Sequence, residues 1–112
     1  MTIYAPDYWL ILDTGQTKKV FASWLGGFMN GPSWKLSSGT KEIIDGESHW
    51  ILPQESGSIY QLHKDCEGSS GWHQVVLQKF LDAYPQLSVV SIAPDGTFTK
   101  KEENEDVSSM EG

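Results

Sequence analysis

The organisation of the chain is clearest in residues 58–84, which read SIYQLHKDCEGSSGWHQVVLQKFLDAY. Apolar and polar side chains alternate over residues 58–64, which is typical of a half-buried strand. Apolar residues then recur over residues 71–84 at the spacing of one helical face, and Pro85 cannot continue a helix. The stretch predicts a strand, a Gly/Ser-rich loop and an amphipathic helix whose first turn is capped by Ser69 or Ser70.

Short extended segments and turns precede this stretch. Residues 8–13 are rich in aromatic and branched side chains and predict the first strand. Residues 18–25 favour a strand that ends at Gly26-Gly27, with a helix as the alternative, because two glycines would cost a helix about 2 kcal/mol. Asp45-Gly46 is the best hairpin signal, since a tight turn needs positive φ at both central positions. Further extended segments are expected at residues 33–37, 40–44, 47–52, 87–92 and 97–99.

This order of elements predicts an α+β fold. We expect an antiparallel sheet of five to seven strands with one principal helix packed on one face. Residues 1–100 are expected to form a single globular domain, since 112 residues suffice for one hydrophobic core. Residues 101–112 are expected to be an acidic, disordered tail, because they hold too little apolar surface to offset the entropy of ordering.

Cysteine content and the N-terminal residues indicate the compartment. Cys66 is the one cysteine, so no internal disulfide can form. The N-terminus lacks the basic start and apolar run of a signal peptide, and no apolar run approaches the ~20 residues that cross a bilayer. A cytoplasmic protein that does not reside in a membrane is therefore expected.

The charge of the chain argues against sequence-specific DNA binding. The formal net charge is −7, and all eight basic residues are lysine. Nucleic-acid binders usually carry a basic stripe, and arginine is the residue that reads guanine with two parallel donors. Five of the acids lie within residues 102–112, namely Glu102, Glu103, Glu105, Asp106 and Glu111. Such an acidic chain suits docking onto a basic protein surface.

Three residues around the loop could carry chemistry: His63, Cys66 and His73. Imidazole and thiolate are ligands that zinc prefers, and a base near a thiol lowers its pKa. A closed zinc site needs four ligands, however, and the neighbouring acids Asp65 and Glu67 disfavour a thiolate. We therefore interpret the three as structural or loop residues and expect neither a metal nor another cofactor.

Tryptophan is the most distinctive residue type of the chain, with five copies. Most large aromatic side chains of so small a chain belong in its core. Trp34 and Trp50 are the preferred candidates for an exposed partner-binding surface, because their strands precede the helix and would reach the sheet face that the helix leaves uncovered.

Three blocks of the middle third carry a resemblance to known sequences. They are residues 33–39 (SWKLSSG), residues 56–60 (SGSIY) and the segment from His63-Lys64 to Gly68-x-Ser70-Gly71. The blocks resemble those of small uncharacterised accessory proteins of phages and other mobile genetic elements. The resemblance implies an accessory protein of mobile DNA and assigns no catalytic residue and no defined partner.

Three classes of function remain open at this point. The favoured one is a non-enzymatic binding or inhibitor protein that acts on a basic protein surface. The alternatives are a small cysteine- or metal-dependent enzyme built on Cys66, His63 and His73, and a single-strand nucleic-acid binder that uses exposed aromatic side chains. The oligomeric state is not indicated by the sequence.

Overall fold

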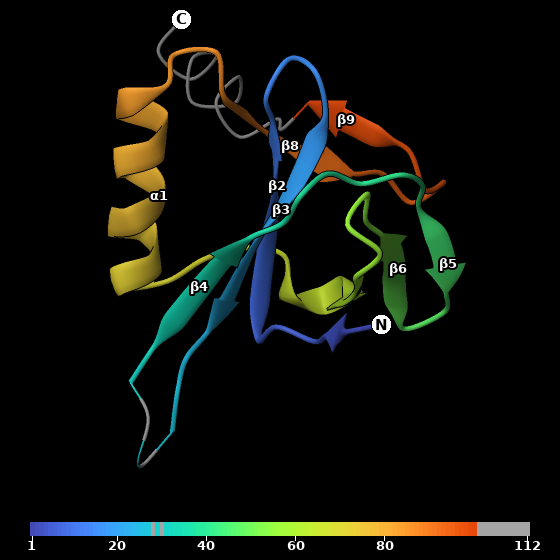
Figure 1. The fold of residues 1–112 in the computed structure, drawn as a ribbon, viewed down its shortest axis with the longest axis horizontal. Helices are drawn as coiled ribbons and strands as arrows, with labels where there is room; N and C mark the ends of the chain where they lie inside the picture. Colours follow the sequence, from blue (N-terminus) through green and yellow to red (C-terminus); the bar gives the residue numbers. More distant parts are fainter. Residues whose placement is uncertain (28, 30, 101–112) are drawn as a thin grey trace, which may run out of the picture.

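The computed structural model, which describes residues 1–27, 29 and 31–100, has three layers (Figure 1). Over this part of the chain, nine strands form two sheets, and one α-helix, α1 (Trp72–Ala83), covers the outer face of one sheet. The predicted α+β class and the predicted helix are confirmed. The strands form two sheets instead of one, and the tail expected at residues 101–112 lies outside the described residues.

The sheet next to α1 has five strands, and every pairing in it is antiparallel. Its order is β4 (Ser33–Leu36), β3 (Lys18–Trp24), β2 (Tyr8–Asp13), β8 (Ser88–Ile92) and β9 (Phe98–Lys100). The strand favoured for residues 18–25 is thus confirmed over the helix alternative, and β3 ends before the two glycines.

The second sheet has four strands, in the order β1 (Ile3–Tyr4), β7 (Ile59–His63), β6 (His49–Pro53) and β5 (Ile44–Gly46). Its pairs are antiparallel except β1 with β7, which is parallel. A short 3₁₀ helix, η1 (Lys64–Cys66), follows β7 and leads toward α1. The chain therefore passes between the sheets after β1, between β4 and β5, and after β7.

Strands β2 and β3 are buried on both faces, which explains their nearly continuous apolar sequences. Trp9 and Ile11 point into the core between the sheets, whereas Leu10 and Leu12 point toward α1. Val76, Leu77 and Phe80 of the helix pack on this second side, and none of them is fully buried. The helix therefore covers the sheet incompletely, and grooves remain on both of its flanks.

The hairpin predicted at Asp45-Gly46 exists, but its turn is displaced by two residues. Gly46 pairs with His49, so Glu47 and Ser48 form the turn, and Glu47 adopts a φ of 73°. The Asp45 carboxylate accepts a hydrogen bond from the Glu47 amide at 2.9 Å, which supports the turn. Gly46 lies within the strand, where an added Cβ would approach the His49 carbonyl oxygen and Ile51 to 3.1 Å.

The predicted serine cap of the helix is wrong. Gly71 precedes the first helical residue with a φ of 54°, and it provides no side-chain cap. Ser70 and Ser69 contribute backbone carbonyl oxygens instead, which accept hydrogen bonds from the His73 amide and the Gln74 side chain. No helix in the described part of the chain has the length and apolarity needed to cross a bilayer.

Candidate functional site

The structure does not bring His63, Cys66 and His73 together. His63 ends β7, where its Nδ1 accepts a hydrogen bond from the Asp65 amide at 3.2 Å and its ring contacts that of His49. Cys66 packs against the core between the sheets. His73 belongs to α1 on the outer face of the five-stranded sheet. Among residues 1–27, 29 and 31–100, no three His, Cys, Asp or Glu side chains are grouped so that they could hold a metal ion.

His73 has a structural role that its place in the sequence, just after the Gly/Ser-rich loop, did not reveal. Its side chain is 2% exposed, and its Nε2 lies 2.8 Å from the carbonyl oxygen of Ser33. A carbonyl oxygen can only accept, so Nε2 carries the proton and donates. This bond fastens the first turn of α1 to the edge strand β4.

The expectation that Trp50 is exposed is wrong, since its side chain is 5% exposed. On β6, alternation directs Trp50 and Leu52 toward the other sheet. A single sheet would have left this face open, whereas the second sheet covers it. The Lys64 ammonium group lies over the indole ring, with its Nζ 4.1 Å from the ring centroid.

Trp34 lies at the surface, in agreement with the sequence prediction of an exposed aromatic at this position. It is 37% exposed on the edge strand β4, and its ring packs against Phe80 at 5.2 Å and Phe21 at 5.9 Å between centroids. Because β4 is an edge strand, no further strand in the described part of the chain covers Trp34, and an open groove lies between its side chain and α1.

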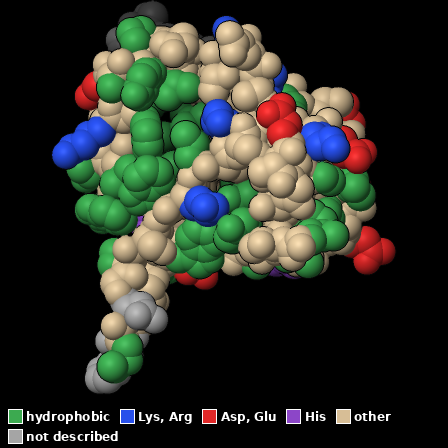
Figure 2. Space-filling model, viewed as in Figure 1, with side chains coloured by type: hydrophobic (Ala, Val, Ile, Leu, Met, Phe, Trp, Pro, Cys, Tyr) green, Lys and Arg blue, Asp and Glu red, His purple; other side chains and the backbone are tan. Residues whose placement is uncertain are grey.

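We call this groove the Trp34 groove, and it has a volume of about 300 Å³. Its lining is almost entirely apolar and consists of Trp34, Val76, Lys79, Phe80, Ala83 and Tyr84. The apolar surface continues onto the helix, where Trp72, Val75 and Tyr84 are 47%, 54% and 50% exposed. Figure 2 shows hydrophobic side chains gathered over α1 and β4 at the left of the view. Exposed apolar side chains that gather on one face are typical of an interaction site.

A second, polar cavity of about 380 Å³ lies where β4 of one sheet faces β1 and β7 of the other. We call it the inter-sheet cavity, and Tyr4, Lys19, Lys35, Ser38, Ser56 and Tyr60 contribute to its lining. Sequence reasoning missed it, because these residues come from four separate stretches of the chain and carry no shared local pattern. The alternation of β4 offers a partial signal, since it turns Lys35 away from the helix side on which Trp34 lies.

Tyr60 is the most perturbed titratable residue of the inter-sheet cavity. Its side chain is 1% exposed, and its hydroxyl group has no hydrogen-bond partner in the described part of the chain. Burial, aided by the neighbouring Tyr4, raises the pKa of Tyr60 to about 12 from an ordinary value of 10.0. The folded protein therefore favours the neutral phenol.

This shift predicts a loss of stability in alkali. Because the pKa of Tyr60 is higher in the folded than in the unfolded state, its contribution is complete below pH 10 and is lost as the pH rises toward about 12. The unfolding free energy of Tyr60→Phe is expected to fall less steeply over this range than that of the wild type. Urea unfolding at a series of alkaline pH values measures the difference, and equal slopes for the two proteins would contradict it.

No family model, no curated protein and no solved structure matches the chain. What the protein does must therefore be inferred from its own surfaces.

Proposed function

We propose that the chain is a non-enzymatic binding protein that holds a basic protein partner on the Trp34 groove. The observation that carries the proposal is the groove itself, an apolar surface with Trp34 at its edge in a chain of net charge −7. Tryptophan is enriched among residues that dominate binding energy, because a large rigid ring loses little entropy when it is covered. The resemblance to accessory proteins of mobile elements agrees with such a role.

The position of the acidic residues supports a basic partner. The described part of the chain ends at Lys100, which lines a cavity on the other flank of α1 together with Leu77 and Leu81. Residues 101–112 follow, and twelve residues can span at most about 40 Å. The five acids of residues 102–112 are therefore within reach of a partner on the helix, where they raise its rate of association.

Lys79 is the cation that lines the Trp34 groove, and its positive charge repels a basic partner that binds there. We infer that the groove supplies apolar contact area, whereas the attraction comes from acids around it. Replacing Lys79 by glutamate should therefore strengthen binding, most of all at low salt, because exposed charges are screened beyond ~8 Å at physiological ionic strength.

The two alternative functions receive no comparable support. An enzyme built on His63, Cys66 and His73 would require all three side chains to meet. His63 and Cys66 lie at the end of β7 and in η1, whereas His73 is buried in α1 on the outer face of the five-stranded sheet. A single-strand binder would use Trp34 and Trp72 as stacking platforms, but such platforms normally lie along a positively charged groove.

Replacing Trp34 by serine is expected to weaken the partner complex about 30-fold, which corresponds to a hot-spot loss of about 2 kcal/mol. Ile44→Ser is the matched control, because Ile44 is 43% exposed on the far edge strand β5. Wild-type and variant proteins would serve as baits for a lysate at low and high salt. Each captured protein would then be purified and its Kd measured with wild type, Trp34→Ser, Ile44→Ser and a chain ending at residue 101.

The proposal is supported if a captured partner has a basic surface and its affinity is lowered by Trp34→Ser but not by Ile44→Ser. Removal of residues 102–112 should slow its association and flatten the salt dependence. Identical sets of captured proteins for wild type and Trp34→Ser, the absence of any captured protein, or a partner with an acidic surface would each contradict the proposal.

A further inference from the structure

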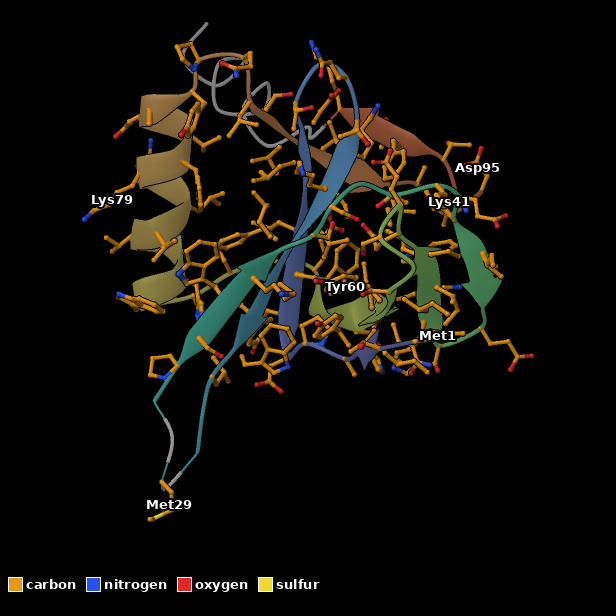
Figure 3. All side chains as sticks on the ribbon, viewed as in Figure 1. Met1, Met29, Lys41, Tyr60, Lys79 and Asp95 are labelled. Carbon is orange, nitrogen blue, oxygen red and sulfur yellow. The ribbon has the colours of Figure 1, made fainter. Side chains whose placement is uncertain are left out.

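The inter-sheet cavity brings together polar groups that have unused hydrogen-bonding capacity. Figure 3 shows Tyr60 between the two sheets, at the centre of the view. The Tyr60 hydroxyl group is buried and has no partner in the described part of the chain. An unsatisfied buried hydroxyl group destabilises the folded state, so a ligand oxygen that accepted a hydrogen bond from it would recover part of that free energy.

Two serine hydroxyl groups at the cavity are also free to donate. The Ser38 Oγ accepts a hydrogen bond from the Ser56 amide at 3.1 Å, and the Ser56 Oγ accepts one from the Ser58 amide at 3.5 Å. In both cases the hydroxyl oxygen uses its acceptor capacity, so its own proton remains available. The cavity therefore presents donors, which is what an anion requires.

Two lysines give the cavity a positive charge. The Lys19 Nζ donates to the carbonyl oxygens of Ser37 at 3.1 Å and Ser38 at 2.7 Å, which holds the ammonium group in place. The Lys35 Nζ lies 5.4 Å from the centroid of the Tyr4 ring. Neither lysine forms an ion pair within residues 1–27, 29 and 31–100. Figure 2 shows lysine side chains near the middle of this face.

No acid lines the cavity in the described part of the chain. Glu55 is adjacent to Ser56, but its carboxyl group lies against Gly39, where an added Cβ would come within 2.9 Å of it. A positive pocket is unusual in a chain of net charge −7, in which acids outnumber lysines by 15 to 8. The charge at the cavity is therefore opposite in sign to the net charge of the chain, which favours an anion over a cation as its ligand.

We propose that the inter-sheet cavity binds the phosphate group of a small phosphorylated molecule. Lysine binds phosphate as a point charge, and a phosphate carries up to three acceptor oxygens that suit donors arriving from several directions. The volume of about 380 Å³ falls in the range of small-molecule sites and leaves room beyond the phosphate for an organic group. A planar carboxylate offers fewer acceptor positions and less charge to the same donors.

The Tyr60 hydroxyl oxygen is closed off from solvent, so a ligand reaches it only after a side chain at the cavity moves. Lys35 is the group that we expect to move, because its ammonium is held over the Tyr4 ring rather than by a carboxylate of the described part. Binding would then transfer this ammonium from the ring to the phosphate and expose the phenol to it. Shifts in the amide resonances of both Lys35 and Tyr60 would report the rearrangement.

The test is a titration of the ¹⁵N-labelled full chain with inorganic phosphate and with glycerol 2-phosphate at constant ionic strength. Lys35→Gln is expected to weaken binding of both probes at least 10-fold. Lys79→Gln is the matched control, since it removes the same charge from the helix surface and should change affinity less than 2-fold. Tyr60→Phe should weaken glycerol 2-phosphate binding several-fold while the protein stays folded, which thermal unfolding would verify.

Trp34→Ser should leave the phosphate titration unchanged. The titration can therefore refute this inference without refuting the proposed function, which depends on Trp34. The inference would be overturned if neither probe shifted the resonances of the cavity at millimolar concentration. It would also be overturned if Lys35→Gln and Lys79→Gln weakened binding equally, or if acetate bound as tightly as phosphate. Tight binding of a phosphoserine peptide without binding of glycerol 2-phosphate would also overturn it, because the ligand would then be a phosphorylated protein and not a small molecule.

Discussion

Replacement of Trp9 by alanine is expected to lower the free energy of unfolding by about 3–5 kcal/mol, the usual range for a buried aromatic side chain. Trp9 is 1% exposed in the core between the sheets. Its Nε1 donates to the carbonyl oxygen of His63 at 2.7 Å, and its own carbonyl oxygen accepts from the Gly68 amide at 2.7 Å. The residue thus links β2 to the end of β7 and to the loop before α1. Urea unfolding followed by circular dichroism measures the loss.

Two controls separate the contributions of volume and hydrogen bonding. Trp9→Phe keeps most of the apolar volume but removes the donor, so it is expected to cost about 1–3 kcal/mol by leaving the His63 carbonyl oxygen unsatisfied. Trp72→Ala should change stability by less than about 1 kcal/mol, because Trp72 is 47% exposed. A cost of Trp9→Ala no larger than that of Trp72→Ala would show that the two sheets do not share one core.

The strands of this fold were largely predictable, whereas their assignment to two sheets was not. Alternation shows which residues share a face of a strand, but it does not say which strand lies beside it. The continuous apolar runs of β2 and β3 did contain the missing information, since a strand of an open sheet needs only one apolar face. Strand β1 was not predicted, because two residues carry no period and its pairing with β7 joins distant parts of the chain.

The tryptophans show the same limit at the level of single residues. Trp34 lies in the alternating segment SWKLS and Trp50 in the short apolar run WIL, and neither pattern says how far the tryptophan is covered by other parts of the fold. Their difference arises from position in the sheets: β4 is an edge strand beside an incompletely covering helix, whereas β6 is an inner strand that faces the other sheet. The exposure of a side chain therefore depends on how the layers assemble. Of the two tryptophans that the sequence favours as exposed, Trp34 is exposed and Trp50 is buried.

The inter-sheet cavity was not predicted, and the alternation of β4, which separates Lys35 from Trp34, is the one partial signal of it in the sequence. Its lysines belong to the five-stranded sheet and its tyrosines to the four-stranded sheet, so the site exists only because the sheets pack face to face. In the sequence, Lys19 and Lys35 look like solvated side chains, and Tyr60 looks like an ordinary core residue of β7. The unpaired state of the Tyr60 hydroxyl becomes visible only once its surroundings are known.

Replacement of Gln54 by leucine is expected to lower the free energy of unfolding by about 3 kcal/mol. Gln54 is 1% exposed at the end of β6. Its Oε1 accepts from the Gly39 amide at 3.2 Å, and its Nε2 donates to the Thr40 Oγ1 and the Leu52 carbonyl oxygen, both at 3.0 Å. This amide thereby fastens the segment that crosses from one sheet to the other. Leucine fills a similar volume but leaves buried polar groups without partners, at about 1–3 kcal/mol each.

Gln54→Glu distinguishes lost hydrogen bonds from altered packing. At neutral pH the carboxylate still accepts from Gly39 but cannot donate to Leu52, and burial opposes its charge, so its folded pKa should rise above the ordinary value of about 4.3. The sign of the linkage follows: stability is largest below pH 4 and is lost as the pH rises through the folded pKa. Urea unfolding measures the difference in unfolding free energy between each variant and the wild type. For Gln54→Glu this difference should be smaller in acid than at pH 7, whereas for Gln54→Leu it should not change. The exposed control Gln86→Leu should stay within about 0.5 kcal/mol of wild type. Equal losses for the leucine and glutamate variants at every pH would contradict the role of the Gln54 donor, because a protonated glutamate regains a donor in a side chain of nearly the same shape.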